Sequence, residues 1–514
     1  MTGLLLGIDA GLTTTKTVLF TPDGEEVAVG TRETPTDEPD TGQREVDLPE
    51  LWATTVNAIE EALAAAPDGS ELEAVGVAGH GHGLYLLDEA GKQVRPAIRS
   101  TDSRATDLVE EWADDGTVDR FRRRLDYEPF AADPLSLLAW LAYHEPDALD
   151  RTAHVCFCKD YLKYRLTGRI CTDEMEASVF TGLADDAYDD GIFDALDIPL
   201  SADVLPEVVP SWEACGSVTE NAAAATGLDT GTPVASGLHD VGATALGTGV
   251  YDAGQGVLIV GTWGQSIVVL DDPFAGVDRD DAPPGLTRRY LDGTALRYKG
   301  LRSAAVCLDW FTEEVGDEWR RRADAEGVSE YAIYDRVAGG VAPGARGLLF
   351  HPYLNGSTDD PDDRGGFYGL TTDHGKADML RSVYEGVALS MSARLHELAP
   401  EDTLSDIRLG GGGARSEVWS DVFAAAVDDP VVVPAGTETG ARGVAICGGV
   451  AADVFPDHET AVDAMVESRR RHEPDPDAAA VYRERRRTFD EALSAIRPTW
   501  KRLHREPKRN RADE

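Results

Sequence analysis

The amino-acid sequence predicts an α/β protein with two lobes that open with related motifs. At residues 4–20, two apolar runs are joined by a polar turn rich in glycine and threonine, which predicts a β-hairpin. Residues 256–269 repeat this order of strand, Gly-Thr turn and strand. A chain of 514 residues is too long for a single hydrophobic core and is sufficient for two or three domains.

The chain is strongly acidic, with a formal net charge of -45 from 48 basic and 93 acidic side chains. In dilute buffer this charge repels itself and loosens the fold, whereas about molar salt shortens the Debye length to roughly 3 Å and screens the repulsion. Together with acidic loops such as residues 359–363, the charge predicts a halophilic protein; an ordinary acidic protein is the alternative. The same charge disfavours nucleic acid as a partner.

Cysteine usage and hydropathy indicate the compartment. Cys156 and Cys158 lack the spacing of a zinc site, and the other cysteines are scattered, so reduced thiols are expected. The first residues have no basic region and too short an apolar run for a signal peptide. No apolar run is long enough to span a membrane. We therefore expect a cytoplasmic protein without a membrane partner.

The turn of the first hairpin has the residue types of a phosphate site. Its glycines permit close approach of a ligand, and the hydroxyl and N–H groups of Thr13 and Thr14 can surround phosphate oxygens. Lys16 adds a positive charge, and Asp9 at the end of the first strand suits a hydrated Mg²⁺. An ordinary hairpin without a ligand is the alternative, and the chain contains no Walker-type loop.

A second candidate site follows the strand predicted at residues 72–78. The sequence Gly-His-Gly-His-Gly places His80 and His82 on a bare backbone, which suits a ligand rich in hydroxyl groups. A structural role or a zinc pair is the alternative, although no third metal ligand has matching spacing. Downstream, Asp102 and Arg104 would point the same way if their segment is extended; the alternative is a surface ion pair.

Asp240 is the third candidate. It lies between a strand predicted at residues 232–236 and a helix of small residues predicted at 241–247. In α/β proteins, functional groups concentrate where a strand ends and a helix begins. The alternative is that Asp240 only caps the helix.

The second half of the chain carries two further motifs. Gly261 and Thr262 form the turn of the repeated hairpin, which would hold phosphates as the first turn does. Gly412, Gly413 and Ala414 lie between a predicted strand and a helix, where bare backbone admits a flat base or ribose. A flexible linker is the alternative, although it fits poorly between a strand and a helix. Two such hairpins would hold one nucleotide between two lobes; a chance recurrence of the hairpin is the alternative. Helices expected at residues 51–63, 134–141 and 159–167 are interpreted as scaffold.

In this order, the segments make the sequence similar to the FGGY carbohydrate kinases over nearly its whole length. Within the family, the chain resembles the L-xylulose kinase group most. It departs from the xylulose kinase pattern at residues 80–82 and 100–102, where Gln-Met-His and Trp-Asn-Asp are usual, so the sugar pocket is rebuilt. The resemblance rests on residues 9–16, 79–83, 237–240, 261–262, 350–356 and 411–414, and the closer placement on residues 133–141, 261–263 and 366–369.

The resemblance implies two ribonuclease-H-like lobes of the actin and hexokinase type, with the active site in a cleft between them. The expected domains are a sugar-binding lobe at residues 1–245, a nucleotide-binding lobe at 246–496 and a basic tail at 497–514. The implied activity is ATP- and Mg²⁺-dependent phosphorylation of a terminal hydroxyl of a small sugar, a ketopentose such as xylulose or ribulose. A polyol kinase of the erythritol or glycerol type, or a non-catalytic sugar or nucleotide sensor, is the alternative.

The resemblance also assigns roles. Asp240 would be the general base, and Asp9 would hold Mg²⁺ through water. The sugar would be bound by His80, His82, Asp102 and Arg104, and the nucleotide by Thr13, Thr14, Lys16, Gly261, Thr262, Gly412, Gly413 and Ala414. A chaperone-type ATPase would not need the sugar-side residues. Whether the protein is a homodimer is left open.

The net charge generates a first prediction. The thermal unfolding midpoint should rise between about 0.1 M and molar KCl, because salt screens the repulsion among carboxylates. Differential scanning calorimetry in a KCl series measures this, with sucrose at matched osmolality as the uncharged control. A midpoint that stays flat or falls with KCl would contradict the halophilic interpretation.

Overall fold

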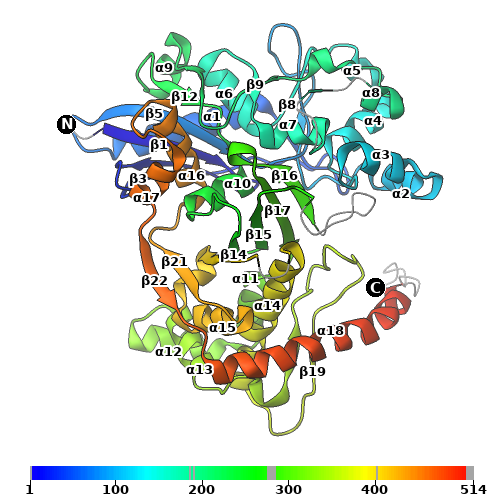
Figure 1. Cartoon of the computed structure of the whole chain (residues 1–514), viewed down its shortest axis with the longest axis vertical. Helices are drawn as coiled ribbons and strands as arrows, with labels where there is room; N and C mark the ends of the chain where they lie inside the picture. Colours follow the sequence, from blue (N-terminus) through cyan, green and yellow to red (C-terminus); the bar gives the residue numbers. More distant parts are fainter. Residues whose placement is uncertain (1–2, 184–186, 189–190, 275–284, 401–402, 505–514) are drawn as a thin grey trace, which may run out of the picture. The chain divides into compact units, whose positions relative to one another are not determined.

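The computed structural model describes residues 3–183, 187–188, 191–274, 285–400 and 403–504 (Figure 1). The chain divides into two compact units that interleave along the sequence. Unit 1 comprises Met1–Ala253, Val269–Arg297 and Glu438–Glu467, and unit 2 comprises Gly254–Val268, Tyr298–Thr437 and Ser468–Glu514. The predicted lobes at residues 1–245 and 246–496 were contiguous, whereas the chain returns twice to unit 1.

Unit 1 is built on a seven-stranded sheet of order β11-β12-β5-β1-β2-β3, with β13 also pairing with β5. The predicted hairpin is confirmed, since β1 and β2 are antiparallel and Leu5 is opposite Phe20. β5 runs parallel to β1, as does β13 to β5. The strands are β1 (Gly3–Ala10), β2 (Thr14–Phe20), β3 (Glu26–Glu33), β5 (Glu71–Gly79), β11 (Ala214–Ser217), β12 (Pro233–Ala235) and β13 (Leu238–His239).

Successive residues of β1 point to opposite faces of this sheet, and each face is covered by different helices. Leu4, Leu6 and Ile8 are buried in one core with α1 (Leu48–Ala64) and α6 (Cys158–Thr167). Gly7 points to the opposite face, against α16 (Thr439–Ala451), which also packs on α10 (Asp240–Gly247). Figure 1 shows orange α16 beside the blue strands, although the two segments are far apart in sequence.

Local sequence signals determine the ends of several helices. The Asp133 carboxylate accepts a hydrogen bond from the N–H of Leu135 and caps α4, which has proline in its first turn, as predicted. α6 ends at Gly168 in the left-handed conformation, also as predicted. The other helices of unit 1 are α2 (Thr106–Asp115), α3 (Thr117–Leu125), α4 (Pro134–His144), α5 (Pro146–Leu149), α7 (Glu174–Thr181), α8 (Gly191–Ala195), α9 (Glu220–Thr226) and α17 (His458–Met465).

A second seven-stranded sheet has the order β16-β17-β15-β14-β20-β21-β22. The repeated hairpin is confirmed, because β14 and β15 are antiparallel, and β20 runs parallel to β14. Its strands are β14 (Gln255–Val260), β15 (Gly264–Leu270), β16 (Leu286–Arg289), β17 (Ala295–Leu301), β20 (Asp406–Gly410), β21 (Val431–Pro434) and β22 (Ser468–His472). The two-stranded sheets pair β4 (Glu45–Val46) with β7 (Ala97–Ile98), β6 (Tyr85–Leu87) with β8 (His154–Cys156), β9 (Cys171–Thr172) with β10 (Glu207–Val208), and β18 (Leu349–His351) with β19 (Gly366–Tyr368).

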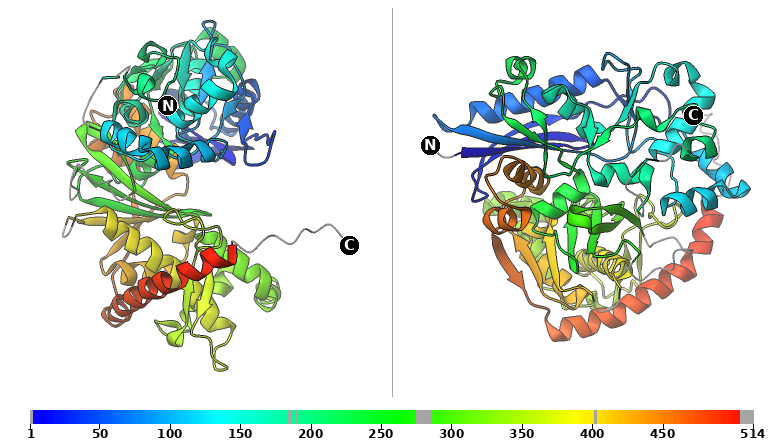
Figure 2. Two further views of the ribbon diagram at one scale, coloured as in Figure 1. Left: turned by 90° about the vertical axis from the view of Figure 1, so that its right-hand side faces the viewer. Right: turned by 45° about the horizontal axis from the view of Figure 1, so that its top comes forward.

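The helices of unit 2 include a long C-terminal one, visible in Figure 2 as an unbroken red helix. Of the predicted basic tail at residues 497–514, positions 497–504 continue this helix, α18 (Pro476–His504), and the remainder lies outside the described residues. No helix of the described residues is long and apolar enough to cross a membrane. All six cysteines are buried free thiols. The remaining helices are α11 (Ala305–Val315), α12 (Asp317–Glu326), α13 (Glu330–Gly339), α14 (Lys376–Leu398) and α15 (Glu417–Val427).

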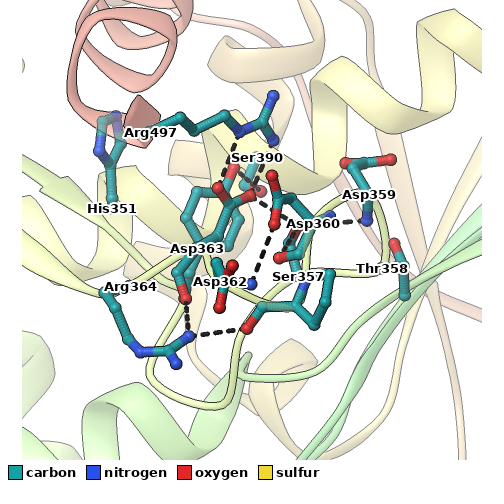
Figure 3. Close-up of polar contacts among 12 residues, drawn as sticks. His351, Ser357, Thr358, Asp359, Asp360, Asp362, Asp363, Arg364, Ser390 and Arg497 are labelled. Atoms are coloured by element: carbon teal, nitrogen blue, oxygen red, sulfur yellow. Dashed lines mark hydrogen bonds and ion pairs between the residues drawn. The ribbon is translucent and has the colours of Figure 1, made fainter. Parts of the chain in front are cut away.

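The acidic loop at residues 359–363 is held by basic side chains of unit 2 (Figure 3). Asp363 is fully buried; Arg497 of α18 donates to both its carboxylate oxygens at 2.7 Å, and Ser357 donates to one of them at 2.7 Å. Asp360 pairs with Lys501 at 2.8 Å, and Asp359 with Lys299 at 2.6 Å. This loop is therefore an ion-paired element that anchors α18, and it gives no support to the halophilic interpretation.

We predict that Arg497→Met lowers the free energy of unfolding by about 3 kcal/mol, because it leaves the buried Asp363 carboxylate without its counterion. Urea unfolding at fixed salt measures the change. Lys501→Met is the matched control: it removes a pair in which Lys501 is 50% exposed and solvent screens the charges, so its cost should be much smaller than that of Arg497→Met. Equal costs for the two variants would contradict a structural role for the Asp363 pair.

Candidate active site

Three parallel strands of unit 1 end at one edge of the sheet. In the register of the sheet, Asp9 of β1 is opposite Ala78 of β5, and His239 of β13 is opposite Gly79. The residues at or just after these strand ends include Asp9, His80 and Asp240. The three segments predicted separately are therefore brought to the same edge, where α/β proteins place functional groups.

Asp240 is the first residue of α10. Its carboxylate accepts hydrogen bonds from the N–H of Val241 at 2.8 Å and from the N–H of Gly81, and 35% of its side chain is exposed. Burial and the negative charge of Asp9 raise the pKa of Asp240 to about 7, although the two N–H groups oppose the shift. The residue at the cap position is His239, whose Nδ1 also accepts from Val241, so capping alone does not account for Asp240.

Asp9 lies in a cluster of charges. Burial raises its pKa to about 6; the charge of Lys16 lowers this pKa, and that of Glu438 raises it. Lys16 is opposite Asp9 in the hairpin, and its Nζ forms an ion pair with Glu438 at 2.7 Å. The cation predicted to bind phosphate is thus held by a carboxylate, and its phosphate role stays a prediction. Thr13 is exposed at the turn, and Thr14 begins β2.

The fit of a metal can be tested on these carboxylates. Among the described residues, no group of three or more His, Cys, Asp or Glu side chains could form a metal site. Mg²⁺, however, is commonly held by one or two carboxylates with water and substrate phosphates. The charge of Asp9 raises the cost of ionising Asp240, which a divalent cation would relieve. The pair therefore fits a hydrated Mg²⁺ and does not form a complete protein cage.

His80 is buried and hydrogen-bonded to protein. Its Nε2 lies 2.9 Å from the Tyr85 hydroxyl, and its Nδ1 lies 3.4 Å from Oγ of Ser100. Burial, together with the charge of Arg99, lowers the pKa of His80 to about 3, so this imidazole is neutral. The two contacts show a structural function for His80, and its predicted contact with a sugar stays a prediction.

The imidazole rings of His82 and His239 lie against each other. Their ring centroids are 5.9 Å apart and nearly perpendicular, and His82 also meets the ring of Phe130 edge-on at 4.8 Å. His82 has φ of 57°, a left-handed conformation that a non-glycine residue rarely adopts. Burial and the charge of Arg288 hold the pKa of His82 well below its usual range and lower that of His239 to about 3.

The conformation and burial of Asp102 and Arg104 differ from both expectations, an extended segment and a surface ion pair. Their segment is a turn rather than a strand, because the N–H of Asp102 donates to the carbonyl of Arg99. Their carboxylate and guanidinium groups pair at 2.9 Å with almost no exposure, so the pair is buried rather than on the surface. Asp102 also accepts from the N–H of Arg44 at 2.6 Å, and Arg104 pairs with Glu45 at 2.7 Å. Protein groups thus occupy most of this carboxylate, and a role in substrate binding stays a prediction.

The two motifs of unit 2 lie together. A side chain at position 413 would approach Val260 at the end of β14 within 2.4 Å, whereas one at position 412 would meet nothing within 4 Å. The turn at Gly261 and Thr262 is fixed by its carbonyls, which accept from the N–H groups of Ala305 and Ala304. The glycine loop and the hairpin turn therefore share one edge of the second sheet, and bare backbone is open at Gly412.

Two residues at the site in unit 1 were missed by sequence reasoning. His239 belongs to the Gly-Leu-His-Asp segment that singled out Asp240, so the alternation of polar residues at a strand end could have identified it. Glu438 gave no local signal, because its partner Lys16 is 422 positions away.

With this geometry in hand, comparison with known proteins identifies the class. Residues 4–247 match the model of the N-terminal domain of the FGGY family of carbohydrate kinases, and residues 256–452 match that of its C-terminal domain. The chain therefore belongs to the FGGY family of carbohydrate kinases. It is an ATP-dependent phosphotransferase that acts on a sugar hydroxyl, built from two mixed α/β lobes with the actin-like ATPase fold, as expected.

Individual relatives differ in the substrates they are named for. The chain is 31% identical to L-xylulose/3-keto-L-gulonate kinase of Escherichia coli (strain K12), across 96% of this chain and 98% of that protein. It is 29% identical to erythritol kinase of Brucella abortus (strain 2308), across 97% and 98% of the two chains. The crystal structure of xylulose kinase from Rhodospirillum rubrum matches with a TM-score of 0.86 at 27% identity, covering 97% of this chain and 99% of that one.

The packing of Gly81 generates a prediction. A Cβ at Gly81 would lie 1.6 Å from Cδ2 of His239, so Gly81→Ala must displace that imidazole. We expect it to lower the free energy of unfolding by about 1–3 kcal/mol. Adding His239→Ala should recover most of this loss, because it removes the clashing ring.

Urea unfolding of the two single variants and the double variant measures this coupling. Gly340→Ala is the matched control, since a Cβ there meets no atom closer than 3.4 Å. Strictly additive effects of Gly81→Ala and His239→Ala would show that the imidazole does not lie against Gly81.

Proposed function

We propose that the protein transfers the γ-phosphate of ATP to a terminal hydroxyl of a small sugar, with Asp240 as the general base. The observation that carries this role is a carboxylate with a pKa of about 7 that remains 35% exposed at the strand edge. A group with this pKa is partly deprotonated at neutral pH and is basic enough to accept a hydroxyl proton in the transition state. As the hydroxyl oxygen attacks phosphorus, Asp240 takes the proton and the bond to the ADP oxygen breaks.

The phosphate and metal residues complete the proposal. Asp9, through water, would hold Mg²⁺, which supplies neutralisation of phosphate charge when bound. Thr13, Thr14 and Lys16 would bind phosphate oxygens, with Lys16 leaving Glu438 to do so. Gly261 and Thr262 would contact the phosphates from unit 2, and Gly412, Gly413 and Ala414 would border the adenosine. The open backbone at Gly412 supports this assignment.

We propose that two neutral imidazoles bind the sugar. His82 and His239 are uncharged at physiological pH, and a neutral imidazole carries one donor and one acceptor. Because Nδ1 of His239 accepts from the N–H of Val241, this ring can present only an Nε2–H donor to a substrate hydroxyl. Among neutral sugars, the proposed substrate is a ketopentose such as xylulose or ribulose, which the names of the xylulose and L-xylulose kinases favour. A small polyol is the second candidate, favoured by the similarity to erythritol kinase.

A non-catalytic sensor could lose the base and keep the nucleotide site. This chain retains Asp9, Lys16 and Asp240, and packs the two carboxylates closely enough for the charge of Asp9 to raise the pKa of Asp240. Retention of a tuned base favours catalysis over sensing.

The base assignment is tested by Asp240→Asn. This variant should fold and bind ATP with unchanged affinity, but lose more than about a hundredfold in turnover, because the amide cannot accept the proton. In the wild type, only the deprotonated Asp240 carboxylate is active. We therefore expect kcat/KM to fall roughly tenfold for each pH unit below about 7 and to be independent of pH above it.

Coupled ADP-release assays with L-xylulose in high salt measure both effects, and calorimetric titration with an ATP analogue checks the fold and nucleotide site. Turnover near that of the wild type in the purified variant would overturn the assignment of Asp240.

A further inference from the structure

Arg288 is a buried cation beside the candidate sugar site. It belongs to β16, and only 2% of the residue is exposed. Its Nη1 donates to the carbonyl of the adjacent Thr287 at 2.8 Å. Its Nη2 is buried without a hydrogen-bond partner among the described residues, and no carboxylate of those residues forms an ion pair with Arg288. Such a charge is costly unless something neutralises it.

The protein stabilises this guanidinium only weakly. Its Cζ lies 4.3 Å above the ring of Tyr127, a cation–π contact. The Tyr127 hydroxyl is turned elsewhere, donating to Asp133 at 2.8 Å. The Asp133 carboxylate in turn accepts from the N–H of Leu135 at the start of α4. The nearby acid is thus engaged by other groups, and the Nη2 atom keeps its hydrogen-bonding capacity.

Several contacts connect Arg288 with the site. Tyr290, two residues along and on the same side as Arg288, donates its hydroxyl to the carbonyl of Gly242 in α10, the helix that Asp240 begins. On the other side, Phe130 contacts the ring of His82 and follows Tyr127 by three residues. The positive charge of Arg288 lowers the pKa of both His82 and His239. The guanidinium therefore acts on the two imidazoles proposed to bind the sugar.

We propose that Arg288 binds a carboxylate of the substrate, so that the preferred substrates are sugar acids, aldonates or keto-aldonates, phosphorylated at the end opposite the carboxylate. This inference rests on the proposed function of the Asp240 site. A guanidinium matches a carboxylate in planar geometry, and the pairing supplies the missing counter-charge. A neutral ketose would leave Nη2 without an ionic partner.

The chemistry favours a carboxylate over a phosphate group. A phosphate ester carries more than one negative charge at neutral pH and needs several cations or N–H groups. Around Arg288, the two histidines are neutral and the other titratable group affected by its charge is the carboxyl of Asp133. A single cation beside an acidic group cannot neutralise the roughly two charges of a phosphate ester, so a singly charged carboxylate is the better match.

The first test uses the wild-type protein and matched substrates. We expect kcat/KM to be at least about tenfold higher for xylonate than for xylitol, for gluconate than for glucitol, and for 3-keto-L-gulonate than for L-xylulose. Xylulose 5-phosphate, tested as a competitive inhibitor, should bind more weakly than xylonate. Phosphorylation of L-xylulose with no preference for any acid would overturn this inference and leave the proposed function intact. Activity on neither class would overturn the proposed function itself.

The second test varies Arg288. Arg288→Met should reduce kcat/KM for the preferred acid by about 10–100-fold while changing that of its neutral counterpart less than about threefold. Arg288→Lys keeps the positive charge but lacks the paired N–H donors of a guanidinium. Its kcat/KM for the acid should therefore lie between the values of the wild type and of Arg288→Met. The KM of ATP should not change in either variant, which separates a substrate contact from a general loss of structure.

Arg297→Met is the matched control. Arg297 lies on β17, the neighbour of β16, is 1% exposed, and donates to Oγ1 of Thr287 at 3.2 Å and to the carbonyl of Pro273 at 2.8 Å. Arg297→Met disturbs the same strands, so it should lower the stability of the protein. It should not alter the ratio of kcat/KM for the acid to kcat/KM for its neutral counterpart. An equal change of this ratio in the Arg288 and Arg297 variants would contradict the proposal. If Arg288→Met fails to fold, Arg288→Lys and the wild-type comparison still decide it.

Discussion

The close contact between α16 and the first sheet is the constraint on which the site in unit 1 depends. A Cβ at Gly7 would lie 1.9 Å from the carbonyl oxygen of Ala441, and one at Gly76 would lie 1.8 Å from that of Val444. The helix backbone therefore rests directly on β1 and β5, which no larger residue would allow. This contact brings Glu438, just before the helix, to Lys16, and desolvates Asp9 beneath it.

The electrostatics of the edge follow from that packing. Burial raises the pKa of Asp9 to about 6, and burial with the charge of Asp9 raises that of Asp240 to about 7. Burial also keeps His82 and His239 neutral. The same exclusion of water thus produces carboxylates that ionise near neutrality and imidazoles that act as uncharged hydrogen-bonding groups. A bound cation would favour the ionised carboxylates, and its positive charge would also disfavour protonation of the imidazoles.

Sequence reasoning predicted the features that local residues determine. The two hairpins, the strand ahead of His80, the Asp133 cap and the end of α6 at Gly168 were all found, because their signals lie within a few residues. It failed where partners are remote. The loop that contains Asp363 was interpreted as support for a halophilic protein, whereas Asp363 pairs with Arg497, which is 134 positions away. The burial of the Asp102 pair likewise depends on Glu45, and the interleaved units depend on the return of α16 to the first sheet.

The comparison among buried arginines is what makes Arg288 informative. Arg104 pairs with Asp102 and Glu45, and Arg381 pairs with Glu385 and donates to Tyr482. Arg99, which is 1% exposed, pairs with no carboxylate of the described residues in this way but donates to the carbonyls of Pro35 and Leu12. Arg288 has a ring face and the carbonyl of its neighbour instead. Because an unpaired buried charge is costly, a cation whose Nη2 makes no hydrogen bond to the described residues, beside neutral sugar-binding groups, is best explained by a negative charge on the substrate.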